Sequence, residues 1–161
     1  MSTFEEMPLS PALLKGLASM GFVKPFPIQE RSIPPLLAGR DLIGQARTGT
    51  GKTAAFSLPM LQGVDTKSHR VQALVLAPTR ELALQITEEA RRIGAQTNAR
   101  IVTIYGGQSI NVQMDALKRG AQIIVGTPGR VIDFLERGWL SLDAVRYVVL
   151  MRRIRCLTWG S

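Results

Sequence analysis

The segment at residues 46–53 contains the residue types that bind phosphate groups. It reads Ala46-Arg47-Thr48-Gly49-Thr50-Gly51-Lys52-Thr53 and joins an apolar run to a stretch with helical spacing. Its glycines let backbone N–H groups converge on phosphate oxygens at the positive N-terminal end of the expected helix. Lys52 would reach the β- and γ-phosphates of a nucleotide, and the Thr53 hydroxyl can bind Mg²⁺. The segment therefore predicts a P-loop, the phosphate-binding loop of many nucleotide-binding proteins.

The first glycine of the usual P-loop pattern is Ala46 in this chain. Because of this departure, the segment taken alone also fits a glycine-rich turn between a strand and a helix that binds no nucleotide. The motifs elsewhere in the chain must therefore decide between the two interpretations.

Most of the chain alternates short apolar runs with amphipathic stretches, which is typical of a parallel sheet with crossover helices. Apolar runs rich in β-branched residues predict strands at Asp41–Gln45, Val71–Ala77, Ile101–Tyr105, Gln122–Gly126 and Val145–Leu150. Helical spacing predicts helices at Glu81–Ile93, Asn111–Arg119 and Gly129–Arg137, with Gly120 and Gly138 as C-terminal caps. We therefore expect one α/β domain with a mostly parallel sheet.

The composition limits the classes to which this protein can belong. The chain has 161 residues, one cysteine and a formal net charge of +8. Cys156 alone cannot form an internal disulfide or a Cys/His zinc cluster, so we expect a reducing, cytoplasmic location. The longest apolar runs are too short to span a membrane. The charge favours a polyanionic partner, and the single histidine, His69, is expected in a solvated loop.

Further motifs stand on both sides of the P-loop. Gly21-Phe22-Val23-Lys24-Pro25-Phe26-Pro27-Ile28-Gln29 precedes it, and Pro78-Thr79-Arg80-Glu81-Leu82-Ala83-Leu84-Gln85, Gly106-Gly107 and Thr127-Pro128-Gly129-Arg130 follow it. In this order and at these spacings, from about Phe4 to Leu150, the chain resembles the DEAD-box RNA helicases. The resemblance implies a RecA-like P-loop domain, which belongs to an enzyme that uses ATP to act on RNA.

The resemblance implies that the first of these motifs is the adenine-reading Q motif. Gln29 would bond the adenine edge, because its amide both donates and accepts hydrogen bonds. Phe22 would stack on the adenine ring and Phe4 would support it. ATP with Mg²⁺ is then the expected nucleotide. Alternatively, Phe22, Phe26 and Ile28 form an ordinary packing cluster under the first helix, and for Phe26 we favour this alternative.

The motifs behind the P-loop follow the C-terminal ends of expected strands, where open parallel sheets place their binding sites. The resemblance implies that they contact the sugar-phosphate backbone of single-stranded or duplex RNA without sequence preference. The residues concerned are Pro78, Thr79, Arg80, Gly107, Thr127 and Arg130. For Arg80 and Arg130, a helix-end charge or an internal ion pair is the alternative role.

The resemblance breaks after Leu150. The family's magnesium-binding motif, Asp-Glu-Ala-Asp, is expected there, but the chain reads Met151-Arg152-Arg153-Ile154-Arg155-Cys156-Leu157-Thr158-Trp159-Gly160-Ser161. Compatible codons for this tail, with one base restored in front, encode Asp-Glu-Ala-Asp-Gln-Met-Leu-Asp-Met-Gly-Phe. We therefore infer a reading-frame shift, which makes residues 1–150 a partial N-terminal RecA-like domain and residues 151–161 an aberrant tail. The restored sequence would lower the net charge from +8 to about +1.

Several interpretations of the chain remain open. It is a damaged or truncated RNA helicase, a non-catalytic module that binds adenine nucleotide or RNA, or a nonfunctional product. A P-loop kinase or GTPase is a further alternative, but the Q motif argues against it. For the tail, the alternative to the frame shift is an unrelated basic segment that binds nucleic acid. Because the magnesium carboxylates and a second RecA-like domain are missing, we expect no ATP hydrolysis or unwinding by this chain alone. We also expect a monomer whose last strand is left partly uncovered.

Overall fold

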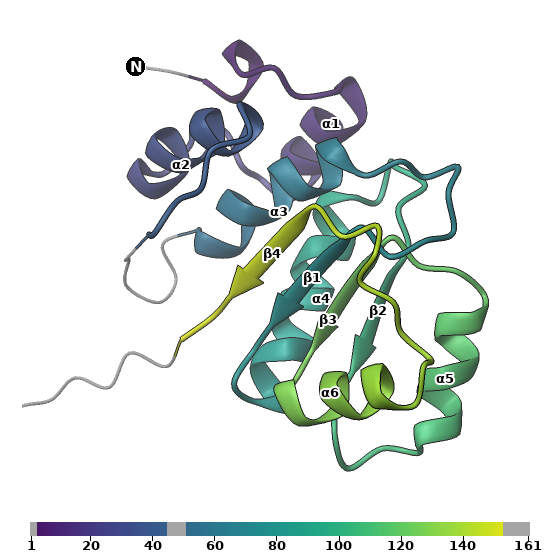
Figure 1. Ribbon diagram of the computed structural model, residues 1–161. Coiled ribbons are helices and arrows are strands. Elements are labelled where there is room, and N and C mark those ends of the chain that lie inside the picture. The colour runs from purple at the N-terminus through teal and green to yellow at the C-terminus, as the bar shows by residue number, and fades with distance from the viewer. Residues whose placement is uncertain (1–2, 45–50, 153–161) are drawn as a thin grey trace, which may run out of the picture.

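The computed structural model describes residues 3–44 and 51–152 of the chain. Within these residues, four parallel strands form one sheet in the order β2-β3-β1-β4. The strands are β1 (Ala73–Leu76), β2 (Ile101–Ile104), β3 (Ile123–Gly126) and β4 (Tyr147–Leu150). The arrows of the strands point the same way, and helices pack around the sheet (Figure 1). This is the α/β architecture that the alternating sequence pattern predicts.

One face of the sheet packs against α3 (Lys52–Gly63) and α4 (Arg80–Ile93). Ala73 and Val75, alternate residues of β1, point into this core because successive side chains of a strand face opposite sides. The apolar side of α4 meets them with Ala83, Ile86, Ala90 and Ile93, which are at most 1% exposed. This face forms the larger of the two cores and holds α3 and α4 against the sheet.

The other face of the sheet packs against α5 (Ile110–Lys118) and α6 (Pro128–Glu136). Leu74 of β1 and Ile124 of β3 lie in this second core. Phe134 of α6 is fully buried and meets the ring of Trp139 edge to face, with the ring centroids 5.4 Å apart. Residues buried on both faces explain why the strands read as continuous apolar runs.

The N-terminal residues form a helical layer beside α3 that the sequence pattern does not delimit. It comprises the 3-10 helix η1 (Phe4–Glu6), α1 (Pro11–Ser19) and α2 (Pro27–Leu37). The Ser10 hydroxyl accepts a hydrogen bond from the backbone N–H of Leu13 and so caps α1. Gly16 of α1 lies directly against the backbone of Ile93, at the end of α4. The layer is therefore held against the same helix that packs on the sheet.

Four of the predicted strands and the three predicted helices are confirmed, and each helix begins one residue earlier than predicted. Gly120 and Gly138 have positive φ angles, of 98° and 72°, as expected for residues that end helices. The strand predicted at Asp41–Gln45 is absent from its described part, residues 41–44, so that prediction is wrong there. Instead of pairing with β4, this segment lines a cavity of about 410 Å³ together with β4. An apolar run alone does not make a strand, because a strand needs a neighbour for its backbone hydrogen bonds.

The strand β4 lies at one edge of the described sheet, next to this cavity. Val148 and Leu150 are 60% and 69% exposed, which confirms that the last strand is partly uncovered. Among residues 3–44 and 51–152, no helix is long and apolar enough to span a membrane.

We expect Gly16→Ala to lower the free energy of unfolding by about 1–3 kcal/mol, the usual penalty for overpacking. A Cβ at this position would collide with the backbone oxygen of Ile93. Gly129→Ala is the control, since Gly129 also lies in a helix and a Cβ there meets nothing within 4 Å. Chemical denaturation measures both variants. Unchanged stability of Gly16→Ala would contradict the packing of α1 on α4.

Candidate functional site

Gln29 connects the start of α2 to the residue that precedes α3. It is the third residue of α2 and is fully buried. Its Oε1 accepts a hydrogen bond from the backbone N–H of Phe26 at 2.9 Å, and its Nε2 donates one to the backbone oxygen of Gly51 at 3.1 Å. A primary amide has two donor hydrogens and two acceptor lone pairs. These two bonds therefore leave one N–H and one lone pair for a ligand.

Gly51 occupies a position that only glycine fits. It is the N-cap of α3 with a φ of 83°, in the left-handed region that L side chains rarely adopt. A Cβ there would collide with Nε2 of Gln29 and lie 2.9 Å from Cδ2 of Phe26. The second P-loop glycine is thus required both for the turn and for the close approach of Gln29.

Lys52 and Thr53 form the first turn of α3, directly after Gly51, and both side chains are half-buried. The free N–H groups of this turn make a site for anions. Lys52 also lines the cavity of about 410 Å³, with Asp41 among the other lining residues. Of the other residues expected to bind phosphate, Ala46, Thr48, Gly49 and Thr50 lie outside the described residues.

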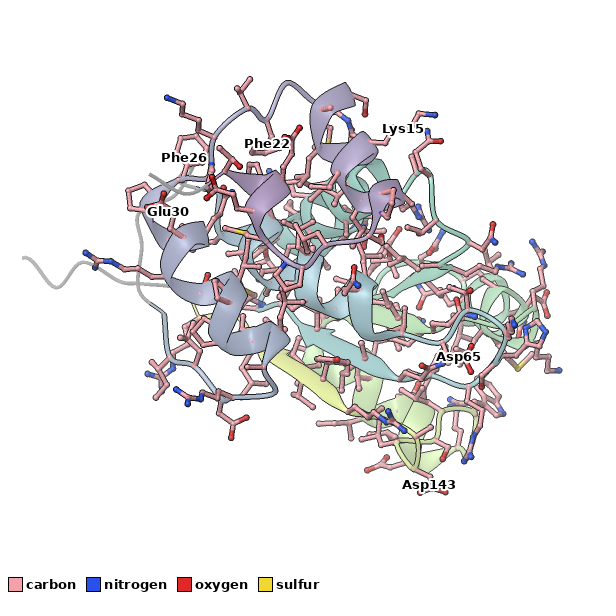
Figure 2. The ribbon with its side chains drawn as sticks, turned by 90° about the horizontal axis from the view of Figure 1, so that it is seen from above. Lys15, Phe22, Phe26, Glu30, Asp65 and Asp143 are labelled. Atoms are coloured by element: carbon pink, nitrogen blue, oxygen red, sulfur yellow. The ribbon has the colours of Figure 1, made fainter. Side chains whose placement is uncertain are left out.

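The aromatic residues of the Q motif differ in their surroundings. Phe4 is 4% exposed and meets the half-buried ring of Phe22 edge to face, at a centroid distance of 6.3 Å. Phe26 is 45% exposed, so the expectation that it belongs to a packing cluster is wrong. Phe26 is the N-cap of α2, ahead of the first turn, and Gln29 and Ile33 fill the space beneath the helix. Figure 2 shows Phe22 and Phe26 on the same side of the molecule.

Two of the motifs that follow the P-loop in the sequence lie close together at the C-terminal ends of β1 and β2. Pro78 and Thr79 follow β1, and the Thr79 hydroxyl accepts a hydrogen bond from the backbone of Leu82 at 3.2 Å, which caps α4. The guanidinium of Arg80 lies over the ring of Tyr105, 5.0 Å from its centroid. Gly107 has a φ of 87°, and a Cβ there would lie 3.6 Å from Nη1 of Arg80. The chain thus brings Arg80 and Gly107 together.

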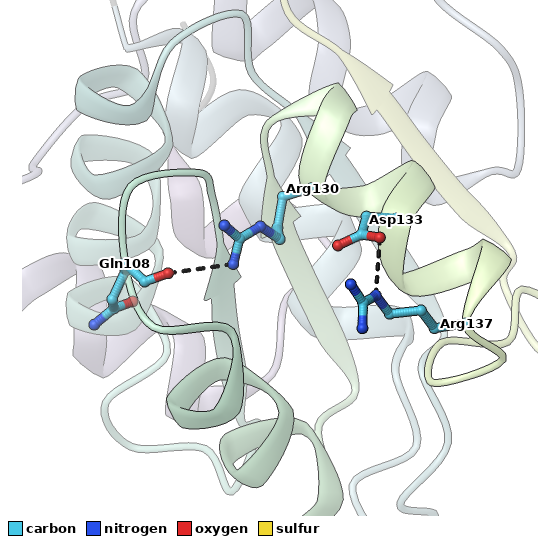
Figure 3. A network of polar contacts seen from close by, with 4 residues as sticks. All are labelled: Gln108, Arg130, Asp133 and Arg137. Carbon is cyan, nitrogen blue, oxygen red and sulfur yellow. Dashed lines mark hydrogen bonds and ion pairs between the residues drawn. The ribbon is translucent and has the colours of Figure 1, made fainter.

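The third motif, which begins at Thr127, lies beside the other two at the C-terminal end of β3. Thr127 is the N-cap of α6, and its hydroxyl makes no capping bond. Arg130 donates from Nη1 to the backbone oxygen of Gln108 at 3.3 Å (Figure 3). Within the described part of the chain, neither Arg80 nor Arg130 pairs with a carboxylate. The alternative of an internal ion pair is therefore not observed for these two arginines.

A family model described as DEAD/DEAH box helicase matches residues 26–150, more than half of the chain. This chain belongs to the DEAD/DEAH box helicase family. The DEAD-box ATP-dependent RNA helicase CshA of Bacillus cereus is 53% identical over 160 residues, which are 99% of this chain and 30% of that protein. The chain thus spans less than a third of this curated relative.

Solved structures of DEAD-box proteins have the same fold as this chain. A DEAD box protein from the hyperthermophile Methanococcus jannaschii has a TM-score of 0.88 and 42% identity, with 92% of this chain and 40% of that chain covered. S. cerevisiae Dbp5 bound to RNA and ADP BeF3 has a TM-score of 0.84 and 41% identity, with 93% and 38% covered. The described sheet and helices are therefore part of a RecA-like domain of this helicase family.

The structure adds residues to this site that the motifs do not mark. Tyr105 lies under Arg80, and the backbone of Gln108 holds Arg130. Gln113 is 2% exposed and holds the connection between β2 and α5, because its amide bonds both the N–H and the oxygen of Tyr105, at 3.2 and 2.9 Å. The pair Gly106-Gly107 marks this connection in the sequence, but nothing in the sequence marks Gln113.

We expect Gln113→Met to lower the free energy of unfolding by about 1–3 kcal/mol, because two buried backbone groups of Tyr105 would lose their partners. Urea denaturation measures the change. Gln96→Met is the matched control at an exposed position, where the change should stay within about 0.5 kcal/mol. Equal stabilities of the two variants would contradict the structural role of Gln113.

Proposed function

We propose that this chain is the N-terminal, ATP- and RNA-binding part of a DEAD-box ATP-dependent RNA helicase. The observation that carries the proposal is the hydrogen bond from the buried Gln29 amide to the backbone of Gly51. It places the side chain expected to read adenine against the last glycine of the P-loop. A P-loop alone fits any nucleoside triphosphate, whereas an adenine reader beside it favours ATP. The family assignment supports the same conclusion.

In this proposal, the phosphates of ATP lie at the N-terminal end of α3. Lys52 and the free N–H groups of the first turn neutralise their charge, and the Thr53 hydroxyl is a ligand for the Mg²⁺ that accompanies ATP. Phe22, supported by Phe4, provides an aromatic ring for the adenine. By the sequence pattern, the rest of the phosphate loop comprises Ala46, Thr48, Gly49 and Thr50. The requirement for glycine at position 51 supports a close approach of Gln29 to the start of α3.

The proposed RNA-binding site is the edge of the sheet at which β1, β2 and β3 end, which we call the carboxyl edge. Arg80 and Arg130 supply positive charge there without carboxylate partners in the described chain. Their positions against Tyr105 and Gln108 restrict their side chains, which lowers the entropy lost on binding. Small or uncharged residues let an RNA backbone come close. These are Pro78, Thr79, Gly107 and Thr127.

We further propose that this chain does not hydrolyse ATP or unwind RNA by itself. Phosphoryl transfer in P-loop enzymes needs carboxylates on the magnesium side and a positioned water in addition to the phosphate loop. The 161-residue chain contains no Asp or Glu after Asp143, although β4, the strand expected to carry them, is present. Binding without catalysis is therefore the activity proposed for this polypeptide, in the cytoplasm and as a monomer.

The frame shift remains our explanation for residues 151–161. The family model's match ends at residue 150, where the departure from the DEAD-box pattern begins. This end point supports the proposed division into residues 1–150 and an aberrant tail, whereas the match to CshA covers 99% of the chain and so includes most of the tail. Reading the codons after Leu150 tests it, and codons that cannot spell Asp-Glu-Ala-Asp in the shifted frame would contradict it.

We expect ATP to compete for the nucleotide site at least about tenfold better than GTP, since Gln29 offers both a donor and an acceptor to adenine. In the variant Gln29→Leu, the ratio of the affinities for ATP and GTP should fall to about one. The control variant Gln96→Leu, changed at an exposed position, should keep the ratio of the unmodified chain. Displacement of a fluorescent ATP analogue measures the ratio, which does not depend on how much of the variant is folded. Equal affinity of the unmodified chain for ATP and GTP would contradict the proposed role of Gln29.

We expect no release of phosphate from ATP by this chain, with or without RNA, above the level of a Lys52→Ala variant. The physical reason is the missing pair of magnesium-binding carboxylates. A radioactive phosphate-release assay with saturating RNA makes the measurement. Turnover clearly above that of the variant would show that hydrolysis does not need these carboxylates here.

A further inference from the structure

The excess positive charge of this chain is concentrated at one edge of the sheet. Four connections lead into the N-terminal ends of the strands, at residues 64–72, 94–100, 137–146 and 118–122, the last of which begins with the final residue of α5. They contain seven basic residues, which we call the basic edge, and only two acidic ones. The basic edge is Lys67, Arg70, Arg100, Lys118, Arg119, Arg137 and Arg146.

The rest of the chain is balanced in charge. The tail at residues 151–161 adds three arginines, and the remaining residues hold ten basic and ten acidic side chains. The four connections thus have a net charge of +5, and outside them and the tail the basic and acidic side chains are equal in number. The net charge of residues 1–150 therefore equals that of the four connections.

The first half of the basic edge is joined by direct contacts. Arg100, which precedes β2, donates from Nη1 to the backbone oxygen of Arg119 at 3.0 Å. The next residue, Gly120, packs so closely on the His69 ring that a Cβ would lie 3.1 Å from its Cγ. Three connections that are far apart in the sequence therefore form one continuous surface.

A small hollow lies beside Arg70 of the basic edge. His69 and Arg70 line this hollow of about 180 Å³ together with Trp139 and Ser141. The guanidinium of Arg137 lies over the Trp139 ring, 4.9 Å from its centroid. The surface therefore continues from Arg70 across the hollow to the end of α6.

Most of these cations lack an acidic partner. Arg70, Lys118 and Arg119 are exposed, and none of them pairs with a carboxylate in the described part of the chain. The two acidic residues of the connections are Asp65 and Asp143. Figure 2 shows them at the end of the molecule away from Phe22 and Phe26. Arg137 pairs with Asp133 at 2.9 Å, and Arg146 lines the cavity beside β4. The charge available to a ligand is therefore mainly that of Arg70, Lys118 and Arg119.

Helix dipoles explain only part of this arrangement. Lys118 and Arg119 stand at the C-terminal end of α5, where a positive charge stabilises a helix. Arg70 and Arg100 precede β1 and β2 and do not follow a helix end directly. Their accumulation beside the helix-end cations therefore indicates a binding surface and not helix stabilisation alone.

We infer that the basic edge binds the phosphate backbone of RNA at a site separate from the carboxyl edge. The choice of RNA as the polyanion rests on the proposed function. Protein interfaces have an apolar centre, whereas nucleic-acid interfaces are more polar and more positive. Among the large exposed apolar residues of the described chain, only Leu142 lies in the four connections. Strands of four residues separate the two edges by about 13 Å, so one RNA of sufficient length can contact both.

The test uses the full 161-residue chain and the triple variant Arg70→Gln, Lys118→Gln and Arg119→Gln. Fluorescence anisotropy with a single-stranded RNA of about 30 nucleotides, over a series of salt concentrations, measures the affinity. We expect at least about tenfold weaker binding near 0.1 M salt. The slope of log K against log salt should fall by about 2, because each lost phosphate contact removes about 0.7.

The control variant Lys15→Gln, Lys24→Gln and Arg31→Gln removes the same charge from exposed positions of the N-terminal layer and should keep the parent's salt slope. Replacing Arg70 and Arg119 by Lys should retain affinity, since charge and not shape is recognised. Equal losses in the triple variant and the control would overturn the inference. Tighter binding of poly-glutamate than of RNA, lost in the triple variant, would also overturn it in favour of an acidic protein.

A further pair, Arg80→Gln with Arg130→Gln, separates this inference from the proposed function. If both sites bind RNA, the decrease in log K for RNA caused by this pair and the decrease caused by the triple variant should add when the variants are combined, because the sites are far apart. If the pair has no effect and the triple variant does, the proposed RNA site at the carboxyl edge fails and the basic edge stands. If only the pair has an effect, the basic edge fails and the proposed function stands.

Discussion

The parallel pairing of β1 with β3 and β4 is the constraint on which the rest of the structure depends. Its register sets Leu76 beside Gly126 on one side and beside Leu150 on the other. Because all strands run the same way, every motif that follows a strand lies at one edge of the sheet. Thr79 and Thr127 are the N-caps of α4 and α6 at this edge, and Thr127 directly follows the last residue of β3. The sheet therefore collects motifs that are far apart in the sequence.

The buried amide of Gln29 links the sheet-bound helix α3 to the N-terminal layer. Its bonds to Phe26 and Gly51 join the start of α2 to the N-cap of α3. An amide suits this position because it donates and accepts at once and is uncharged when buried. The side chain proposed to read adenine is thus also part of the scaffold of the phosphate loop. In the proposed function, adenine recognition and phosphate binding therefore depend on the same local geometry.

The two edges of the sheet differ in how their positive charge is held. At the carboxyl edge, Arg80 and Arg130 lie against Tyr105 and a backbone oxygen, which fixes their positions. At the basic edge, Arg100 and Arg137 are held by similar contacts, to a backbone oxygen and to Trp139, whereas Arg70 and Arg119 are exposed and unpaired in the described part of the chain. Side chains held in fixed positions can bind an RNA backbone in one defined register. Exposed charges distributed over a surface attract RNA with an affinity that depends on salt concentration. The fold separates the two kinds of contact because helices return the chain to the opposite edge.

The sequence by itself determined the family, the fold class and the positions of four strands, because local apolar patterns and motif spacing are properties of short segments. It also predicts a P-loop and a Q motif and shows the departure from the family pattern after Leu150. Only the tertiary structure decided that residues 41–44 do not pair as a strand and that Phe26 is exposed. Gln113 and the contacts that join the basic edge were likewise invisible in the sequence. Each of these depends on a partner brought from a distant segment, which no local pattern encodes.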